Sequence, residues 1–273
     1  MKYSYEYEIK YQEVDDRKKL RLVHMELYLL EVAGKVADEL GFGIAQLHPI
    51  GLTWIITRLS LEMTELPGPS DKIRIETWIE GNAHMLSTRD YRIYMKPSAY
   101  SGHHSDEWKL IGQCKSVWAV LDMNKREIVN IFDQPMFEGC VDGEVLDMTR
   151  VRMTTIPEPT GCVPHKVVYS DLDYNRHCNS CKYLQTMLDA YLPDYYGKKI
   201  RLDINYSKEV MAGEELMTHY LVTEDGVQYQ QKIDSGETSC SAKITVIFPC
   251  HQAGSASLFR SAADTRNCSG RSA

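Results

Sequence analysis

The sequence lacks several features that would place it in a specialised class of protein. It has no apolar run near the roughly 20 residues that a membrane-spanning helix needs, so we expect no membrane insertion. With 17 glycines and 10 prolines among 273 residues it is neither fibrous nor of low complexity. It carries 31 basic against 38 acidic residues, a formal net charge of −7. A general nucleic-acid binder needs an excess of Lys and Arg for phosphate contacts, so we expect no nucleic acid as partner.

Cysteine is present but is not arranged as a disulfide scaffold. The eight cysteines are scattered over a long chain, several of them in strand-like segments, whereas disulfide scaffolds are short and rich in cysteine. The first ten residues, MKYSYEYEIK, alternate apolar or aromatic with polar side chains and lack the apolar stretch of a secretory signal. We therefore expect a protein of the reducing cytoplasm.

Apolar side chains alternate with period two in many segments and recur at helical spacing in two. The period-two pattern predicts strands over residues 3–11, 52–63, 72–80, 88–95, 109–122, 165–170, 199–208, 215–223, 227–233 and 238–248. Residues 22–40 and 179–192 have the spacing of amphipathic helices, and Gly41 fits the position that ends the first. A strand, a long helix and several strands in series indicate an α+β fold, with a helix packed on an antiparallel sheet.

The same order of elements occurs twice. YQEVDDRKK can be laid over YSDLDYNRH at an offset of 158 positions. That offset is far too long for a solenoid repeat and indicates a duplicated domain whose copies pack as a pseudo-dimer. Where the second copy has Asp173, Asn175 and His177, the first has Asp15, Arg17 and Lys19. The copies are therefore predicted to share a scaffold but not a chemistry.

The polar trio of the second copy precedes the second predicted helix. Unpaired backbone N–H groups there favour an anion or a carbonyl oxygen that becomes negative. An imidazole moves protons near neutral pH, an amide can bind a carbonyl, and a carboxylate can orient both. The alternative is a capping loop in which Asp and Asn merely satisfy backbone donors, and spacing alone favours it slightly.

The segment DLDYNRHCNSCKYLQTMLD resembles the signature of acyl-acyl carrier protein (acyl-ACP) thioesterases, D-x-N-x-H followed by a small polar pair and K-Y. Four other blocks resemble that family's N-terminal half in order and spacing: LTWIITRLSLEM, DKIRIETWIEG, STRDYRIY and CKSVWAVLDMNKREI. The resemblance covers about residues 3–248. It implies a double hotdog fold, in which two tandem domains each pack a long helix against an antiparallel sheet.

In that fold we expect an N-terminal hotdog domain with the acyl pocket over residues 1–130 and a connector over residues 131–163. A C-terminal hotdog domain with the catalytic residues would cover residues 164–249. Residues 250–273 are rich in Ser, Ala and Gly and are expected to form a disordered tail.

The resemblance implies hydrolysis of the thioester between a fatty acyl chain and the pantetheine arm of ACP, with no cofactor or metal. It assigns catalysis to Asp173, Asn175, His177 and Glu209. Glu209 and His177 would activate water, Asn175 would hold the carbonyl and Asp173 would position its neighbours. Which of Glu209 and His177 is the general base stays open, and Glu209 taken alone could be a solvated surface charge.

The resemblance also implies an acyl tunnel built mainly from the first copy, with substrate binding by Trp54, Arg58 and Trp78. Ordinary core packing of the tryptophans is compatible with this, because a tunnel is an unfilled part of a core. Plant members of the family carry a cysteine directly after the glutamate, but this chain has Val210. A cysteine nucleophile is therefore excluded at that position, which favours attack by water.

Other candidate motifs have simpler interpretations. Cys178 and Cys181 form one C-x-x-C, which we interpret as two buried thiols rather than half a zinc site or a redox pair. His103 and His104 are interpreted as loop residues rather than metal ligands. Basic clusters at residues 17–21 and 198–201 could dock an acidic carrier protein or be solvated surface charges.

Three classes of function remain. We favour an acyl-ACP thioesterase. The second class is another hotdog enzyme, an acyl-CoA thioesterase or a 3-hydroxyacyl dehydratase, and the Asn of D-x-N-x-H argues against the dehydratase. The third is a non-catalytic acyl-binding module, against which the joint presence of His177 and Glu209 argues. The sequence leaves open the acyl chain length, its saturation, ACP or CoA as carrier, and a homodimer of the pseudo-dimer.

Overall fold

The computed structural model describes residues 1–101 and 105–247. The predicted tail over residues 250–273 and the paired His103 and His104 lie outside the described residues. The α-helices are α1 (Leu22–Glu39), α2 (Ile44–Leu47) and α3 (Ser180–Ala190). The strands are β1 (Tyr3–Glu8), β2 (Leu52–Met63), β3 (Lys72–Asn82), β4 (Ser87–Lys96), β5 (Lys109–Asp122), β6 (Glu127–Ile128), β7 (Gly161–Lys166), β8 (Lys199–Tyr206), β9 (Glu215–Thr223), β10 (Gly226–Lys232) and β11 (Thr238–Ile247).

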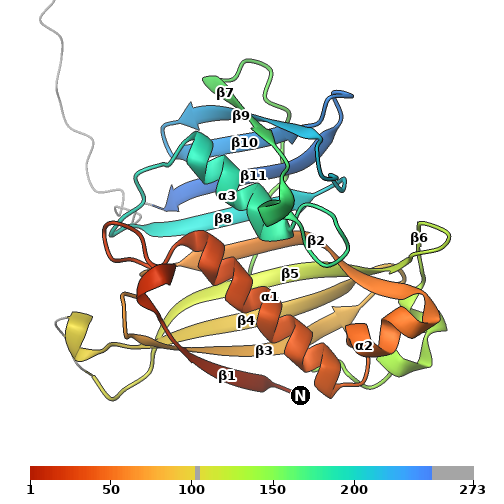
Figure 1. Ribbon diagram of the computed structural model, residues 1–273. Coiled ribbons are helices and arrows are strands. Elements are labelled where there is room, and N and C mark those ends of the chain that lie inside the picture. The colour runs from red at the N-terminus through yellow and green to blue at the C-terminus, as the bar shows by residue number, and fades with distance from the viewer. Residues whose placement is uncertain (102–104, 248–273) are drawn as a thin grey trace, which may run out of the picture.

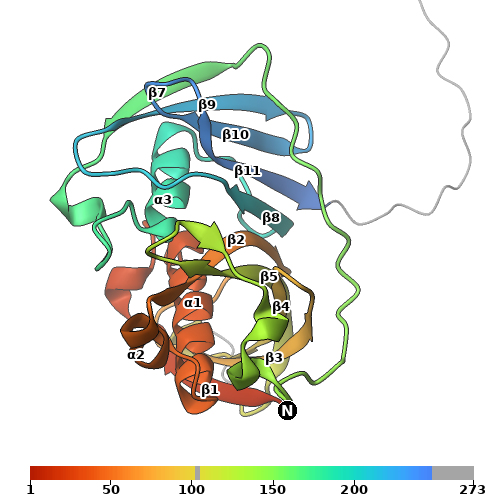
Figure 2. The ribbon, with the colours of Figure 1, turned by 90° about the vertical axis from the view of Figure 1, so that its right-hand side faces the viewer.

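These strands form a single sheet with a mirrored strand order. The order is β1-β3-β4-β5-β2-β8-β11-β10-β9-β7, with the short β6 paired to β5. Outward from the β2–β8 seam, each half therefore repeats the same sequence of strands. Helices α1 and α3 lie on the same face of the sheet (Figure 1), and the sheet curves around them (Figure 2). This is the double hotdog architecture that the resemblance implied.

The seam between the halves is antiparallel, and its residue pairs alternate between polar and apolar. β2 pairs with β8 from Arg58 opposite Asn205 to Met63 opposite Ile200, with Leu61 facing Leu202 at its centre. Both of these leucines are fully buried. They belong to one hydrophobic core that draws residues from α1, α3 and both halves of the sheet. The two copies thus share a core rather than meeting as separate domains.

The duplication is visible in the positions at which matching elements begin. β1 and β7, the 3-10 turns Tyr11–Glu13 and Tyr169–Asp171, and helices α1 and α3 each begin 158 positions apart. The helices themselves differ, since α1 has 18 residues and α3 has 11. The helix of the first copy is therefore longer than that of the second.

Helix α1 forms where apolar residues recur at helical spacing. Leu22, Met25, Leu29, Val32 and Val36 are all buried, which is the stripe that a helix packed on a sheet requires. The helix ends at Glu39 and Leu40 caps it; Gly41 follows as expected, with a φ of +81° and an N–H that donates to the Asp38 carbonyl.

One predicted strand is wrong. The segment predicted as a strand over residues 165–170 is the end of β7 followed by the 3-10 turn Tyr169–Asp171. The turn forms because Asp171 Oδ2 accepts the Val168 N–H at 3.0 Å, a local bond that competes with strand pairing. The short elements α2 and β6 were not predicted, and β7 begins inside the segment expected to be the connector.

Candidate active site

The loop before α3 carries the polar trio, and Asp173 shapes it. Asp173 Oδ1 accepts the N–H groups of Asn175 at 2.8 Å and of His177 at 3.0 Å. The Asp173 N–H donates to the His177 carbonyl at 2.8 Å. Arg176 completes the turn with a φ of +67°. The capping-loop interpretation therefore holds for the Asp173 carboxylate, which leaves Asn175 and His177 as the side chains free for chemistry.

The first copy builds the same loop with other side chains. Asp15 Oδ1 accepts the N–H groups of Arg17 at 3.0 Å and of Lys19 at 2.9 Å, and Lys18 has a φ of +58°. The predicted sharing of a scaffold is thus confirmed at the level of individual hydrogen bonds.

His177 and Glu209 face each other at the mouth of a cavity. His177 Nδ1 lies 3.6 Å from Glu209 Oε1, and their side chains are 21% and 36% exposed. The two loops are held together by backbone contacts, since the Cys178 N–H donates to the Val210 carbonyl at 2.7 Å and His177 bridges to Met211. This placement leaves an imidazole and a carboxylate close together where water can reach both.

A residue of the first copy completes this constellation. The guanidinium of Arg126, in the turn between β5 and β6, pairs with Glu209 Oε2. Sequence reasoning missed Arg126, because it lies 83 positions from Glu209 and the two residues come together only in the folded protein. Its only signal was its place at the end of the block CKSVWAVLDMNKREI.

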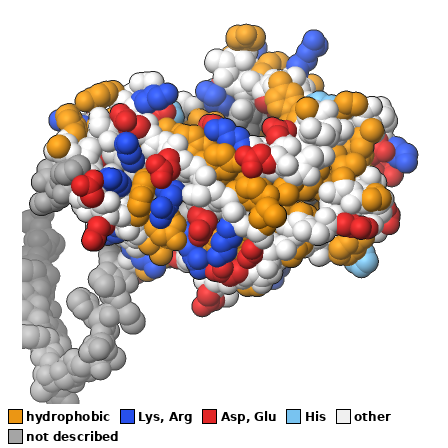
Figure 3. Space-filling model, turned by 90° about the horizontal axis from the view of Figure 1, so that it is seen from below, with side chains coloured by type: hydrophobic (Ala, Val, Ile, Leu, Met, Phe, Trp, Pro, Cys, Tyr) orange, Lys and Arg blue, Asp and Glu red, His pale blue; other side chains and the backbone are white. Residues whose placement is uncertain are grey.

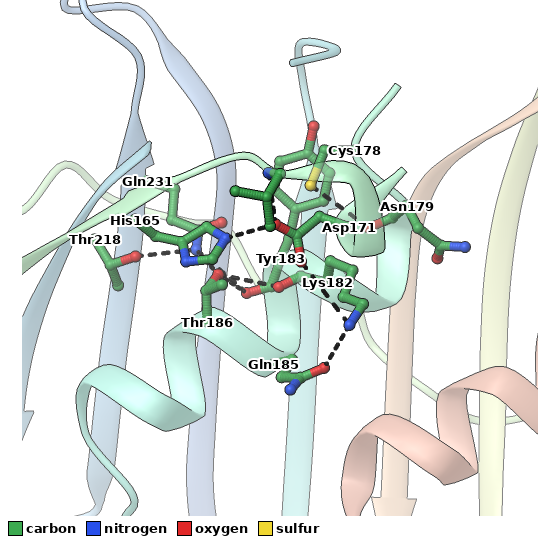
Figure 4. A network of polar contacts seen from close by, with 11 residues as sticks. His165, Asp171, Cys178, Asn179, Lys182, Tyr183, Gln185, Thr186, Thr218 and Gln231 are labelled. Atoms are coloured by element: carbon green, nitrogen blue, oxygen red, sulfur yellow. Dashed lines mark hydrogen bonds and ion pairs between the residues drawn. The ribbon is translucent and has the colours of Figure 1, made fainter. Parts of the chain in front are cut away.

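A buried network anchors the loop to α3 (Figure 4). Asp171 Oδ2 bonds to His165 Nε2 at 2.8 Å, and the Asn179 N–H donates to the Asp171 carbonyl at 2.8 Å. Burial opposes ionisation of Asp171, but the bonds from the Val168 N–H and His165 outweigh it and lower the pKa of its carboxyl. Asn179 then caps α3 by accepting the Cys181 N–H at 3.0 Å.

A cavity of about 1270 Å³ extends from this constellation into the first copy. Asp173, Asn175, His177 and Glu209 line it at the second copy's end. The apolar side chains that line it come from α1, the segment after it and the inner sheet face, and include Leu27, Leu30, Phe42, Trp54, Ile56 and Ile79. Such a long, mainly apolar space fits a fatty acyl chain.

Of the three residues expected to bind substrate, Trp54, Arg58 and Trp78, only Trp54 lines the cavity. Trp54 lines the cavity, and its Nε1 donates to the Phe42 carbonyl at 2.9 Å, which fixes the indole. Among the described residues, neither Arg58 nor Trp78 lines it. A β-bulge between Ile56 and Arg58 interrupts the alternation of β2, so the next buried side chain is Leu59 rather than Arg58.

Trp78 instead packs on the other side of β3. It is fully buried in a cluster with Leu146 and Met148 of the connector, and its Nε1 donates to the Glu144 carbonyl at 2.8 Å. Its neighbour Ile79 faces the cavity, as alternation along a strand requires. Trp78 therefore fixes the connector to the sheet.

The C-x-x-C pair consists of two buried thiols, as predicted. Burial raises the pKa of the Cys178 thiol to about 12 and that of Cys181 well above its usual range, so neither is a ready thiolate. No group of three or more His, Cys, Asp or Glu in the described ranges could hold a metal ion. The helices that the structure describes are all too short or too polar to cross a membrane.

The basic cluster at residues 198–201 is paired with acids, whereas in the cluster at residues 17–21 only Arg17 forms an ion pair among the described residues. Arg17 and Lys198 both pair with Asp194, and Lys199 and Arg201 both pair with Glu62. The face of the molecule in Figure 3 likewise intermixes acidic and basic side chains. Such pairing reduces the positive potential of the 198–201 cluster more than that of the 17–21 cluster.

The fold and the site together define a double hotdog protein with an acid–base pair at the mouth of an acyl-sized cavity. Residues 1–137 match the model of the acyl-ACP thioesterase N-terminal domain, and residues 160–248 match that of the C-terminal domain. The chain belongs to the acyl-ACP thioesterase family, whose members are hydrolases of thioester bonds.

Solved structures and curated relatives agree with this family. An acyl-ACP thioesterase from Bacteroides thetaiotaomicron superposes with a TM-score of 0.71 and 26% identity, covering 89% of this chain and 97% of that one. A 12:0-ACP thioesterase from Umbellularia californica has the same fold, with a TM-score of 0.73 and 17% identity over 89% and 96% of the chains. A chloroplastic palmitoyl-ACP thioesterase of Gossypium hirsutum is 22% identical over 73% of this chain and 48% of its own. The chain spans about half the length of the curated relatives it matches.

Proposed function

We propose that this protein hydrolyses fatty acyl-ACP to a free fatty acid and ACP by attack of an activated water. The observation that carries this proposal is the approach of His177 and Glu209 to 3.6 Å at the mouth of the apolar cavity. An acyl chain in the cavity would leave its thioester beside this pair, within reach of solvent water.

The roles follow from the chemistry of each side chain. The Glu209–His177 pair takes a proton from water as its oxygen attacks the carbonyl carbon, and the proton then passes to the sulfur as the C–S bond breaks. Asn175, next to the N-terminus of α3, donates to the carbonyl oxygen as it becomes negative. Asp173 is a positioning residue for the loop, and Arg126 orients Glu209. Water and thioester are consumed, and acid and thiol are released, so the reaction balances without a cofactor.

The cavity wall in this proposal is apolar, with Trp54 as its fixed aromatic contact; Arg58 and Trp78 act elsewhere. The carrier is proposed to be ACP, with its pantetheine arm entering at the mouth lined by residues 173–177 and 206–209. A homodimer stays a prediction, which the molar mass of the purified protein in solution would test.

The experiment measures fatty acid release from a panel of acyl-ACPs, with matched acyl-CoAs beside them. Wild type is compared with Glu209→Gln and with a control, Glu65→Gln, which removes another partly exposed glutamate that pairs with a cation and does not line the cavity. Glu209→Gln should lower turnover by roughly 10²–10⁴-fold, as loss of a general acid–base group does, while the control stays near wild type.

The products distinguish the alternatives. Preferential hydrolysis of acyl-CoA would change the proposed carrier, and an enoyl thioester formed from a 3-hydroxyacyl substrate would identify a dehydratase. Acyl binding by a folded protein that hydrolyses neither thioester would establish a binding module and overturn the proposal.

A further inference from the structure

The cavity's inner end, between β3 and β4, holds a buried cation. Arg89 on β4 is only 5% exposed and lines the cavity. Its guanidinium makes a long hydrogen bond of 3.5 Å to Thr77 Oγ1. Among the described residues, no carboxylate lies within ion-pair distance of it. A buried charge is costly unless it is paired, and structural arginines in cores normally have an acidic partner.

Two further polar side chains share this end of the cavity. Asn82 lines it, and its buried Oδ1 has no hydrogen-bond partner in the described structure, while its Nδ2 contacts only Cys140 Sγ at 3.8 Å. Ser87 lies directly opposite Asn82 in the β3–β4 pairing and also lines the cavity. The inner end is thus polar and unsatisfied, whereas the wall around Leu30, Phe42 and Trp54 is apolar.

The pairing of the strands gives the separation, measured along the sheet, between this end and β8, the strand that precedes Glu209. Arg89 lies opposite Ser116 of β5, Ser116 opposite Leu59 of β2, and Leu59 opposite Ile204 of β8. Tyr206, two residues further along β8, lines the cavity beside Glu209. Three strand spacings amount to roughly 14 Å, a length that an extended medium-chain acyl group spans.

We propose that Arg89, Asn82 and Ser87 form a polar subsite for an oxygen-bearing far end of the acyl chain, a carboxylate or another oxygen acceptor. The inference rests on the proposed function, because the thioester must lie at His177 and Glu209 for the far end to reach Arg89. A guanidinium presents several N–H donors in a planar fork that fits a carboxylate and also bonds hydroxyl or carbonyl oxygens. A plain methyl end would displace water from the cation and return no hydrogen bond.

The test compares three acyl-ACPs of equal medium chain length, ending in a methyl, a hydroxyl or a carboxylate. Wild type should hydrolyse at least one oxygenated substrate with a kcat/KM roughly tenfold or more above the plain one, because an unpaired polar site discriminates strongly. Arg89→Met, which keeps length and removes the donors, should reverse that preference, and Arg89→Lys should keep part of it.

The matched control is Arg58→Met, which removes a half-buried arginine of β2 that does not line the cavity. Its substrate ratios should equal those of wild type. Equal ratios in wild type and Arg89→Met, or a wild-type preference for the plain chain, would overturn the subsite. If Arg89→Met does not fold, the wild-type ratios and those of Arg89→Lys still decide.

Failure of the proposed function would look different, since no thioester would then be hydrolysed. Calorimetry tests the subsite in that case, with medium-chain fatty alcohols as one ligand set. The other set consists of the same alcohols carrying a carboxylate in place of the terminal methyl group. Tighter binding of the ω-carboxy ligand to wild type, lost in Arg89→Met and partly kept in Arg89→Lys, supports the subsite, and equal binding of the two ligands to wild type contradicts it.

Discussion

The two copies build one loop and use it differently. In each copy an aspartate, Asp15 or Asp173, accepts two backbone N–H groups and holds the turn before the helix. At the position aligned with Asn175 the first copy has Arg17, which pairs with Asp194 and lies over the Tyr196 ring. In the second copy Asn175 and His177 line the cavity. The comparison separates the part of the D-x-N-x-H signature that folds the loop from the part that can react.

The copies also differ in what they enclose. The first copy has the longer helix, and its residues form most of the cavity wall. The second copy contributes only residues within 173–183 and 206–209 to that wall, and its interior is filled by side chains such as Tyr229 and Gln231. Under the proposed function, acyl binding and chemistry therefore reside in different copies.

The largest expected effect comes from giving the second loop the first loop's side chains. Asn175→Arg with His177→Lys should lower turnover by roughly 10³-fold or more, since both the proton carrier and the carbonyl donor are lost. The fold should persist, because Asp173 bonds to backbone N–H groups that the substitutions keep. Turnover and thermal melting of the double variant check this, and an active double variant would refute the division between the copies.

The second prediction concerns Glu26, where the copies meet. Glu26 is fully buried on α1 and accepts the Tyr206 hydroxyl of the second copy, while the aligned residue of α3 is the buried Leu184. Burial raises the pKa of Glu26 from 4.5 to about 7, despite hydrogen bonds from Tyr206 and Cys181. The folded protein therefore holds a proton that the unfolded chain releases above pH 4.5, so the contribution of Glu26 to stability is greatest at low pH and falls as pH rises toward 7.

Glu26→Leu, which copies the second helix, should remove that slope. The free energy of unfolding of wild type should fall by on the order of 3 kcal/mol from this group between about pH 4.5 and 7. Asp90, whose burial also raises its pKa to about 7, adds a slope of the same sign that remains in the variant. Denaturant unfolding at several pH values measures the difference, and parallel curves for the two proteins would contradict the assignment.

The third prediction is a matched pair of loop substitutions. Asp15→Ala and Asp173→Ala should each cost about 2 kcal/mol of stability, because each removes an acceptor shared by two backbone N–H groups. Only Asp173→Ala should also lower kcat, since only its loop carries reacting side chains. Denaturant unfolding and turnover are measured on both, and an equal loss of kcat in the two variants would contradict this separation.

The smallest effect is expected at the bridge between the copies. Arg126→Gln should change stability by less than about 1 kcal/mol, because its pair with Glu209 is largely exposed. It should still lower kcat several-fold by releasing the Glu209 carboxylate from its orientation. Lys125→Gln, which removes the neighbouring exposed lysine, is the control and should leave kcat unchanged.

Much of the fold could be predicted because strand bounds and the duplication follow from patterns of neighbouring residues in the sequence. The alternation of apolar residues gave the bounds of β2 and β5 without error, and the 158-residue offset gave the duplication. The D-x-N-x-H segment and Glu209 were found through the resemblance, and the structure brings their side chains to one cavity mouth.

What could not be predicted depends on contacts distant in sequence or on single irregularities. Because of a bulge in β2, the side chain of Arg58 does not line the cavity. Regular alternation along β2 would predict that it does. The pair of Arg126 with Glu209 exists only after the two halves join at the seam. The sequence does not distinguish Arg89 from other arginines in strands. Only the structure shows that, among the described residues, no carboxylate pairs with it.

The measurement that tests the central claim most directly is acyl-ACP hydrolysis by two alanine variants at aligned positions, His177→Ala in the second copy and Lys19→Ala in the first. We expect His177→Ala to lose roughly 10²–10⁴-fold in turnover while Lys19→Ala retains it. Full activity of folded His177→Ala, or an equal loss in both variants, would contradict the claim that the second copy's loop performs the chemistry.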